Sequence, residues 1–297
     1  MMRDAFSSFH PAVNFVYFTT VIVGSMIFMH PVLQAIALLS ASAYALLLRG
    51  KRAARFNLLY MAPLLLLMAV VNPLFNHAGI TILAYLPSGN PITLESLAYG
   101  LAAACMYVTV IIWFSCYNVV MTSDKFIYLF GRLWPALSLV FSMTLRFVPR
   151  YGEQIRIIAN AQASIGRSAG QGGVLERARN GVRILSMMTT WALENAIETA
   201  DSMKSRGYGL PGRTSFALFR FDRRDQAVSA VLFGLMLIVG AGACAGYNTM
   251  RFFPSIRLPE LSLPSLAVYA AYGLLCPLPV LIQLLEEIKW RFTASGS

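Results

Sequence analysis

The stretch Leu97–Met121, LAYGLAAACMYVTVIIWFSCYNVVM, contains no charged residue and no proline. A helix needs about 20 mainly apolar residues to cross the hydrocarbon core of a bilayer, so this stretch is long enough to span a membrane. The whole chain has a matching composition: of 297 residues, 57% are hydrophobic and 12% are charged, against about 25% charged residues in soluble domains. The sequence therefore predicts an all-α integral membrane protein.

Five further stretches are also apolar and are separated by charged or turn-forming residues, which makes about six transmembrane helices. The predicted spans are Ala12–Met29, Val32–Leu48, Phe56–Val71, Leu97–Met121, Gln226–Tyr247 and Ser265–Leu285. We accordingly expect three parts. They are an N-terminal bundle of four spans (1–121), a polar region of coupling helices (122–225), and a C-terminal pair of spans with a tail (226–297).

The positive charges indicate the orientation of these spans. Of the 24 Lys and Arg residues, only Arg251 and Arg257 lie in segments assigned to the outside, and 15 lie within 122–225. Because short loops rich in Lys and Arg stay in the cytoplasm, we expect a multi-pass protein of a bacterial-type plasma (inner) membrane with both termini cytoplasmic. The net charge of +11 is then explained without nucleic acid as a partner.

The interiors of the predicted spans contain no Asp, Glu, Lys, Arg or His. Ionisable groups in a membrane usually mark ion pathways, so their absence argues against proton- or sodium-coupled transport. The chain also lacks a phosphate-binding Gly-x-x-x-x-Gly-Lys loop, its histidines are scattered, and its cysteines (Cys105, Cys116, Cys244, Cys276) lie in apolar runs. We therefore expect no catalytic, cofactor or metal site. The alternative is a self-sufficient permease or channel with a cytoplasmic regulatory region, which would need a polar path through the spans.

The polar region 122–225 contains an apolar run and two predicted helices. Leu133–Leu145 is too short to span, so we expect it at the membrane interface; a seventh span there would place positive charges on competing sides. Pro149 suits the first turn of a helix, and Gly166 is expected to end that helix. A second helix is predicted at Gly181–Ser205, stopped by Gly207. Its apolar stripe comprises Leu185, Met188, Ala192, Ala196, Ala200 and Met203.

The two glycine stops can be read in two ways. Glycine takes a left-handed conformation easily, and a cation in the last turn meets the negative end of the helix dipole, so each stop could be an ordinary helix end. Alternatively, the small residues Ser205 and Gly207 on either side of Arg206 leave its guanidinium projecting from the helix end. Such a group suits a groove lined with carboxylates or carbonyls on another protein.

These motifs, in this order, resemble those of the transmembrane T component of energy-coupling factor (ECF) transporters, importers related to ABC transporters. The resemblance covers most of the chain. It rests on His10-Pro11 before the first span, Ile92-Thr93 before the fourth, Arg146-Phe147-Val148-Pro149, Ala161-Gln162, and Met203–Tyr208.

The resemblance implies a mechanical role without catalysis. Two cytoplasmic ATPase subunits would dock on the ends of the two coupling helices, and their movement would reorient a membrane substrate-capture (S) subunit that takes up a vitamin or micronutrient. Ser205, Arg206 and Gly207 match one docking motif. The other departs from the pattern, because Ser164-Ile165-Gly166 has isoleucine where arginine is expected. Either Ile165 docks as an apolar knob or Arg167 supplies the charge, and the ATPase pair is then expected to be non-identical.

Overall fold

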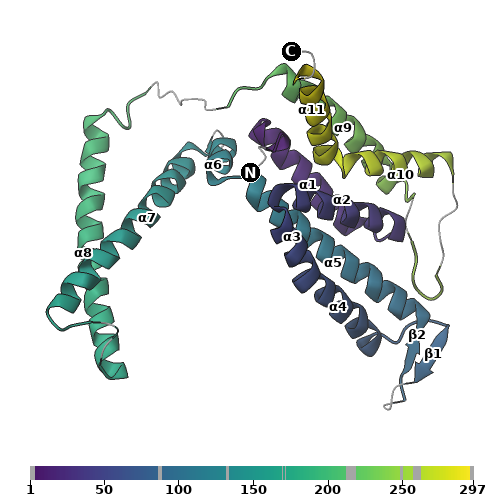
Figure 1. Ribbon diagram of the computed structural model, residues 1–297, viewed down its shortest axis with the longest axis horizontal. Coiled ribbons are helices and arrows are strands. Elements are labelled where there is room, and N and C mark those ends of the chain that lie inside the picture. Colours follow the sequence, from purple (N-terminus) through teal and green to yellow (C-terminus); the bar gives the residue numbers. More distant parts are fainter. Residues whose placement is uncertain are drawn as a thin grey trace. The chain divides into compact units, whose positions relative to one another are not determined.

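The structure is a computed structural model that describes residues 4–85, 89–131, 134–168, 170, 172–211, 219–247, 250–256 and 262–294. The chain divides into two compact units. Unit 1 comprises Met1–Phe126 and Phe219–Ser297, and unit 2 comprises Ile127–Leu218. Unit 2 is therefore inserted into the sequence of unit 1, which the chain leaves once and re-enters once (Figure 1).

The helices of unit 1 follow the predicted spans. By length and composition, four of the described helices can cross a membrane, namely α2, the continuous α3–α4 stretch, α5 and α9, and the bent pair α10–α11 would be a fifth. The remaining predicted span corresponds to α1, a shorter apolar helix of 17 residues. The elements are η1 (Phe6–Ser8), α1 (Pro11–Ile27), α2 (Pro31–Arg49), α3 (Lys51–Phe56), the π-helical turn η2 (Asn57–Met61), α4 (Ala62–Phe75), β1 (Ile82–Tyr85), β2 (Pro91–Thr93), α5 (Leu94–Val120), α9 (Arg223–Cys244), α10 (Leu263–Leu275) and α11 (Leu278–Ala294).

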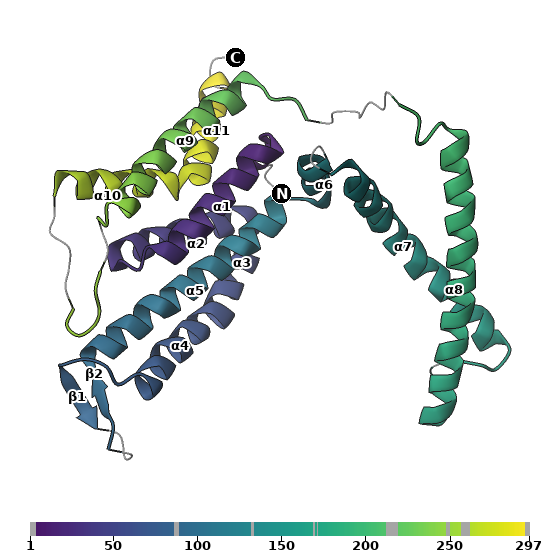
Figure 2. The same cartoon turned by 180° about the vertical axis from the view of Figure 1, so that it is seen from behind.

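The core of unit 1 is built on aromatic side chains where α1, α2 and α5 pack together (Figure 2). Trp113 of α5 is fully buried, and its ring centroid lies 5.9 Å from Tyr17 and 6.2 Å from Phe18 of α1. Tyr44 of α2 lies 6.4 Å from the same ring. Edge-to-face and tilted ring pairs of this kind add about 0.5–1.5 kcal/mol each beyond the burial of their area. The three helices are thus held by specific ring contacts as well as by hydrophobic burial.

The segment between α4 and α5 contains a small β-hairpin that the sequence did not predict. β1 and β2 pair antiparallel, with Ile82 opposite Thr93. Thr93 also caps α5, because its hydroxyl accepts a hydrogen bond from the Ser96 amide at 3.2 Å. Helix α5 consequently begins at Leu94, three residues before the predicted span.

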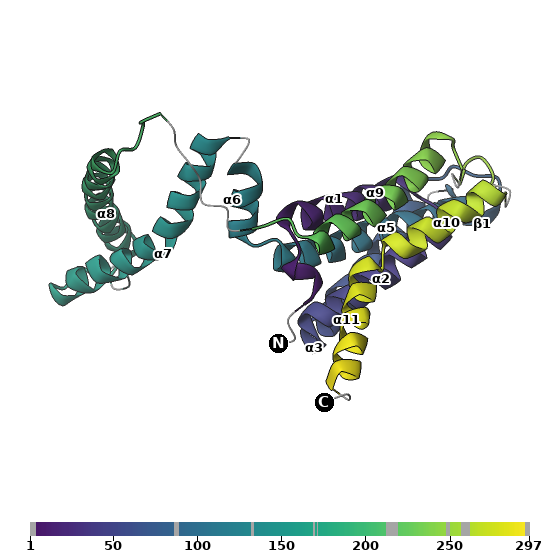
Figure 3. The ribbon, with the colours of Figure 1, turned by 90° about the horizontal axis from the view of Figure 1, so that it is seen from above.

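The last predicted span, Ser265–Leu285, is not one straight helix. α10 and α11 meet at an angle of 58° (Figure 3). Pro277 and Pro279 lack the backbone N–H that a continuous helix needs, which explains the break. The hydroxyl of Tyr17 donates to the carbonyl of Cys276 at 2.6 Å and satisfies an acceptor at the bend.

The small-residue run of α9 serves internal packing at Gly242, where a Cβ atom would lie 2.3 Å from Val268 Cγ2 of α10.

Two predicted helix starts are wrong. After α6 (Ser123–Gly131), α7 runs from Pro135 to Ser164, so Pro149 lies inside the helix and the apolar run expected at the interface forms its first half from Pro135 onward. A proline inside a helix removes one backbone bond but does not oblige the helix to begin there. α8 runs from Val174 to Ser205, seven residues longer at its start than predicted, because Gly181 is accommodated in its interior. Of the described helices, α7 is not one of those that are long and apolar enough to cross a membrane.

Candidate docking site at the ends of α7 and α8

Within unit 2, an aromatic contact holds α7 against α8. The ring of Tyr151 meets the ring of Trp191 edge-on, with centroids 5.5 Å apart. Phe147 stacks on Tyr151 at 5.7 Å, and the guanidinium of Arg150 lies 5.5 Å from the Trp191 ring centroid. Ring pairs and cation–π contacts such as these each contribute about 0.5–1.5 kcal/mol. The crossing of the two helices therefore has a defined register.

The end of α7 is tied to α8 by two polar contacts. The side-chain amide of Gln162 lies 3.7 Å from the sulfur of Met187, within range of a weak hydrogen bond. The side-chain amide of Asn180 donates to the carbonyl of Ser168 at 3.2 Å, in the turn that follows α7. These contacts fix the end of α7 and the turn that follows it against the first half of α8.

The apolar residues of α8 lie on two faces, so the predicted stripe is only partly buried. Met188 is buried at 6% exposure, together with Ile184. Leu185, by contrast, is 64% exposed, and Leu193 and Ile197 are 61% and 64% exposed. A helix of this kind, with polar residues on its third face, retains apolar surface for another contact.

The end of α7 is a Schellman cap. Ile165 is the capping residue, and Gly166 follows with φ +75°, the left-handed conformation that glycine takes without a steric penalty. The Gly166 amide donates to the carbonyl of Ala163 at 3.0 Å, and the Arg167 amide donates to the carbonyl of Gln162 at 2.9 Å. This pair of bonds defines the motif.

The end of α8 repeats the same cap. Arg206 is the capping residue, and Gly207 follows with φ +81°. The Gly207 amide donates to Lys204 and the Tyr208 amide donates to Met203, both at 3.0 Å. The prediction that Gly166 and Gly207 end the two helices is therefore confirmed. The structure also places Ile165 at the position in its cap that Arg206 occupies in the other.

A third cap of this kind, at the end of α9, shows what the motif itself requires. There Gly246 has φ +75°, and the amides of Gly246 and Tyr247 donate to Ala243 and Gly242. Its capping residue is Ala245, so the cap forms without an arginine. The side chain of Arg206 is exposed, and within the described residues it has no hydrogen-bond or ion-pair partner. The fold thus accounts for Gly207 and leaves the guanidinium of Arg206 available.

The predicted site residues lie in three kinds of place: in the contact between α7 and α8, on the exposed side of α7, and at the two helix ends. Phe147 and Gln162 take part in the contact between α7 and α8, whereas Arg146, Pro149 and Ala161 are exposed along α7. The docking candidates Ser164, Ile165, Gly166 and Arg167 are exposed at one helix end, and Ser205, Arg206 and Gly207 lie at the other. Figures 1 and 2 show these two ends apart, on either side of the crossing, so they form two sites. The side-chain contacts between the helices were missed by the sequence because they join residues 25 to 41 positions apart.

Comparison with known proteins identifies a family and several partial relatives. Residues 6–216 match the family CbiQ, described as cobalt transport protein. The chain is 38% identical over 106 residues to the energy-coupling factor transporter transmembrane protein EcfT of Lactobacillus helveticus. It is 35% identical over 109 residues to EcfT of Lacticaseibacillus paracasei and 32% identical over 106 residues to EcfT of Lactococcus lactis subsp. cremoris.

The three matches to EcfT proteins are partial. They cover 34–35% of this chain and 38–41% of those relatives, so less than half of each relative's length is matched. The family match, in contrast, covers more than half of the chain. The chain therefore belongs to the CbiQ family of cobalt transport proteins, and its resemblance to the T component of ECF transporters is confirmed.

Proposed function

We propose that this chain is the energy-coupling transmembrane scaffold of an ATP-driven vitamin or micronutrient importer. Two cytoplasmic ATPase subunits bind the ends of α7 and α8, and their closure on ATP moves these helices. The movement reaches a substrate-capture subunit in the membrane. In this proposal 1–121 and 226–297 form the membrane part, 122–225 forms the cytoplasmic coupling part, both termini are cytoplasmic, and ATP is hydrolysed by the partner subunits.

The observation that carries the proposal is the position of Arg206. Its cap is complete without the side chain, and the exposed guanidinium stands at the tip of a 32-residue helix. Such a group binds carboxylates in a bidentate geometry, which gives both affinity and orientation. Ile165 holds the same place at the end of α7 and is 60% exposed. Unequal side chains at equal positions support a pair of non-identical ATPases.

The exposed apolar face of α8 supports a second contact. Leu185, Leu193 and Ile197 are each more than 60% exposed, which is costly in water. We assign this face to the membrane surface or to the capture subunit. Contact with the capture subunit would place a moving helix directly against the component that it must move.

The test is affinity purification in mild detergent after co-expression with the ATPase subunits. We expect Arg206→Glu to abolish recovery of one ATPase, because it replaces the docking cation by a repelling charge. Arg179→Glu, an exposed arginine near the start of the same helix, is the matched control and should leave recovery unchanged. Equal recovery in both variants would contradict docking at Arg206. Transport by the chain alone in liposomes would instead support a self-sufficient permease.

A further inference from the structure

The first described residues of the chain form a segment that is firmly anchored in unit 1. We call Asp4–His10, which contains η1, the N-terminal segment. Phe6 is fully buried, and its ring centroid lies 5.0 Å from Tyr17 in the aromatic core. Phe9 is 6% exposed. The N-terminal segment is therefore part of the packed bundle and moves with it.

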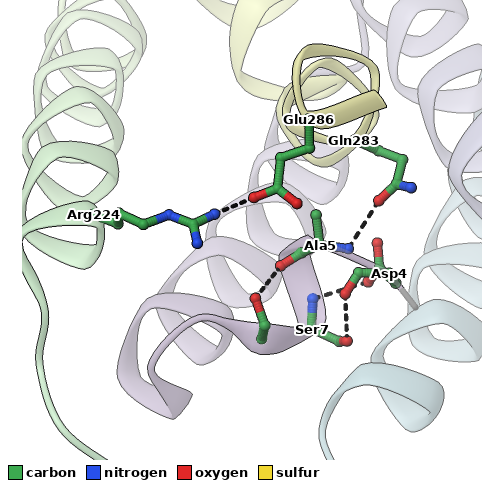
Figure 4. Close-up of polar contacts among 7 residues, drawn as sticks. Asp4, Ala5, Ser7, Arg224, Gln283 and Glu286 are labelled. Carbon is green, nitrogen blue, oxygen red and sulfur yellow. Dashed lines mark hydrogen bonds and ion pairs between the residues drawn. The ribbon is translucent and has the colours of Figure 1, made fainter. Parts of the chain in front are cut away.

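Hydrogen bonds join the N-terminal segment to two further helices. The hydroxyl of Tyr44 on α2 donates to Asp4 Oδ2 at 2.8 Å. The amide of Ala5 donates to Gln283 Oε1 on α11 at 2.8 Å, and Gln283 is buried. Figure 4 shows Asp4, Ala5 and Ser7 of the N-terminal segment beside the ion pair that Arg224 of α9 forms with Glu286 of α11.

The chain leaves unit 1 next to Lys125, a buried lysine that binds the N-terminal segment. Its ammonium donates to the carbonyl of Ser7 at 2.6 Å and to the carbonyl of Val120, the last residue of α5, at 2.9 Å. With the amide of Asn14 turned so that both of its polar atoms are satisfied, Asn14 also accepts from the ammonium at 3.2 Å. All three donors of the ammonium are then used. Burial lowers the pKa of Lys125, and the Asp4 carboxylate acts in the opposite direction.

The chain returns to unit 1 next to Asp225, a buried carboxylate that binds the same segment. Asp225 Oδ1 accepts from the His10 amide at 2.9 Å. Its Oδ2 accepts from the amide of Asp222, the N-cap of α9, at 2.9 Å and completes a capping box. Phe219 is the first residue of the returning chain, and the ring of Phe221, two residues later, lies 5.1 Å from the ring of His10. The returning chain is therefore fixed to the end of the N-terminal segment by the hydrogen bond from His10 to Asp225 and by a ring contact, while the capping box orients the Asp225 carboxylate.

Lys125 and Asp225 make the same pair of contacts from opposite helix ends. Lys125, in the first turn of α6, bonds to the end of the preceding helix α5 and to the N-terminal segment. Asp225 bonds to the start of its own helix α9 and to the same segment. The signs of the charges suit these places, because a cation is favoured at the C-terminus of α5 and an anion at the N-terminus of α9. Both side chains are more than 90% buried, at 8% and 5% exposure. Burying a charge is costly unless it is fully hydrogen-bonded, so such groups fix a defined geometry.

We propose that the N-terminal segment is the joint through which movement of unit 2 enters the membrane bundle, with Lys125 and Asp225 as its positioning residues. This inference rests on the proposed function. Both connections to unit 2 are fixed to one short segment, which is itself bonded to α2 and α11 and continues into α1. A displacement at either connection is thus passed to several helices together. Two loosely attached connections would instead absorb the displacement.

The test is hydrogen–deuterium exchange of the purified complex with its ATPase subunits, without nucleotide and with ATP plus vanadate. In the wild type we expect nucleotide to change exchange in 127–218 and also in the N-terminal segment. In Lys125→Met, which keeps the chain length but removes the donors, we expect the first change to persist and the second to be lost. Asp225→Asn should act in the same way, because its amide cannot accept from the Asp222 N–H and the His10 N–H together. Asp124→Asn, an exposed neighbour, is the control and should match the wild type.

A response in the N-terminal segment of both variants equal to the wild-type response would overturn the joint. A rise in exchange across the whole bundle that does not depend on nucleotide would also overturn it, since this would show a purely structural role. If Lys125→Met does not accumulate in the membrane, the exchange pattern of Asp225→Asn tests the proposal instead. Failure of the proposed function would give a different result: the ATPases would not co-purify, or exchange in 127–218 of the wild type would not respond to nucleotide. Either result would also contradict the proposal that the N-terminal segment is a joint.

Discussion

Ile165 and Arg206 occupy the same position in two matching helix caps. Each is the capping residue before a glycine of positive φ, and each cap is closed by the same two backbone bonds. Since the backbone geometry is shared, a difference in binding between the two helix ends must come from the side chains. The identity of the capping residue is therefore the variable to change.

At the α7 end, Ile165→Ala and Arg167→Ala distinguish the two ways of docking. We expect Ile165→Ala to weaken binding of the ATPase at that end by about 10- to 30-fold, because removing two or three buried methylene equivalents costs about 1.5–2 kcal/mol. Arg167→Ala should have a smaller effect, since Arg167 lies beyond the glycine. Surface plasmon resonance with the purified ATPase measures both. A larger loss for Arg167→Ala would show that the charge, and not the apolar knob, makes the contact.

The two glycines that close these caps should resist substitution. Gly207→Ala places a Cβ atom 3.1 Å from Leu210 Cδ1 and forces a left-handed alanine, and Gly166→Ala imposes the second penalty alone. Each left-handed residue costs about 1–2 kcal/mol. Gly152→Ala and Gly181→Ala, inside α7 and α8 with nothing within 4 Å, are the controls and should stabilise by about 0.5–1 kcal/mol. Amide exchange of the last helical turns measures the difference, and equal effects at all four positions would contradict the cap assignment.

The contact between Tyr151 and Trp191 should couple α7 to α8 energetically. We expect the double-mutant cycle of Tyr151→Leu and Trp191→Leu to give an interaction energy of about 0.5–1.5 kcal/mol, the range for edge-to-face rings. Thermal unfolding of the purified complex, followed by tryptophan fluorescence of the other sites, provides the measurement. Additive effects of the two substitutions would mean that the ring contact contributes nothing specific.

The sequence predicted those features that depend on neighbouring residues. The apolar runs marked the helices, and the stops at Gly166 and Gly207 were found because a cap is built within a few residues. The helix starts were missed for the same local reason. Pro149 and Gly181 disfavour a helix interior in isolation, yet α7 and α8 extend through them. Propensity costs of about 1–3 kcal/mol are small enough for packing to override.

Contacts between distant segments could not be predicted from one sequence. Lys125 and Asp225 looked like ordinary charges of a polar region, and only the fold brings both to the N-terminal segment. The bend after Cys276 was signalled by two prolines, but the hydroxyl that satisfies it comes from Tyr17, 259 positions earlier. Burial of charge, a long-range property, is what distinguishes these residues from the exposed arginines around them.

In α9, close packing should make Gly242 far less tolerant than Gly240. A Cβ atom at Gly242 would lie 2.3 Å from Val268 Cγ2, whereas Gly240 has nothing within 4 Å. We expect Gly242→Ala to destabilise by about 1–3 kcal/mol, the usual cost of overpacking, and Gly240→Ala to be near neutral. Resistance to unfolding in sodium dodecyl sulfate compares the two variants. Equal sensitivity would show that α9 and α10 separate more easily than their packing implies.

His10 should make the stability of unit 1 depend on pH. Burial lowers the pKa of His10 from its usual 6.5, an effect larger than the opposing one of the Asp225 carboxylate. The unfolded chain therefore takes up the proton more readily, so the contribution of His10 is fully present above pH 6.5 and is lost as the pH falls through the lowered pKa. Protonation would also remove the Nδ1 acceptor that caps Ala12 at 3.2 Å. His10→Asn keeps a neutral cap acceptor that does not titrate. We expect the Tm of the wild type to fall more than that of His10→Asn between about pH 7.5 and about pH 5, and parallel curves would contradict this role of His10.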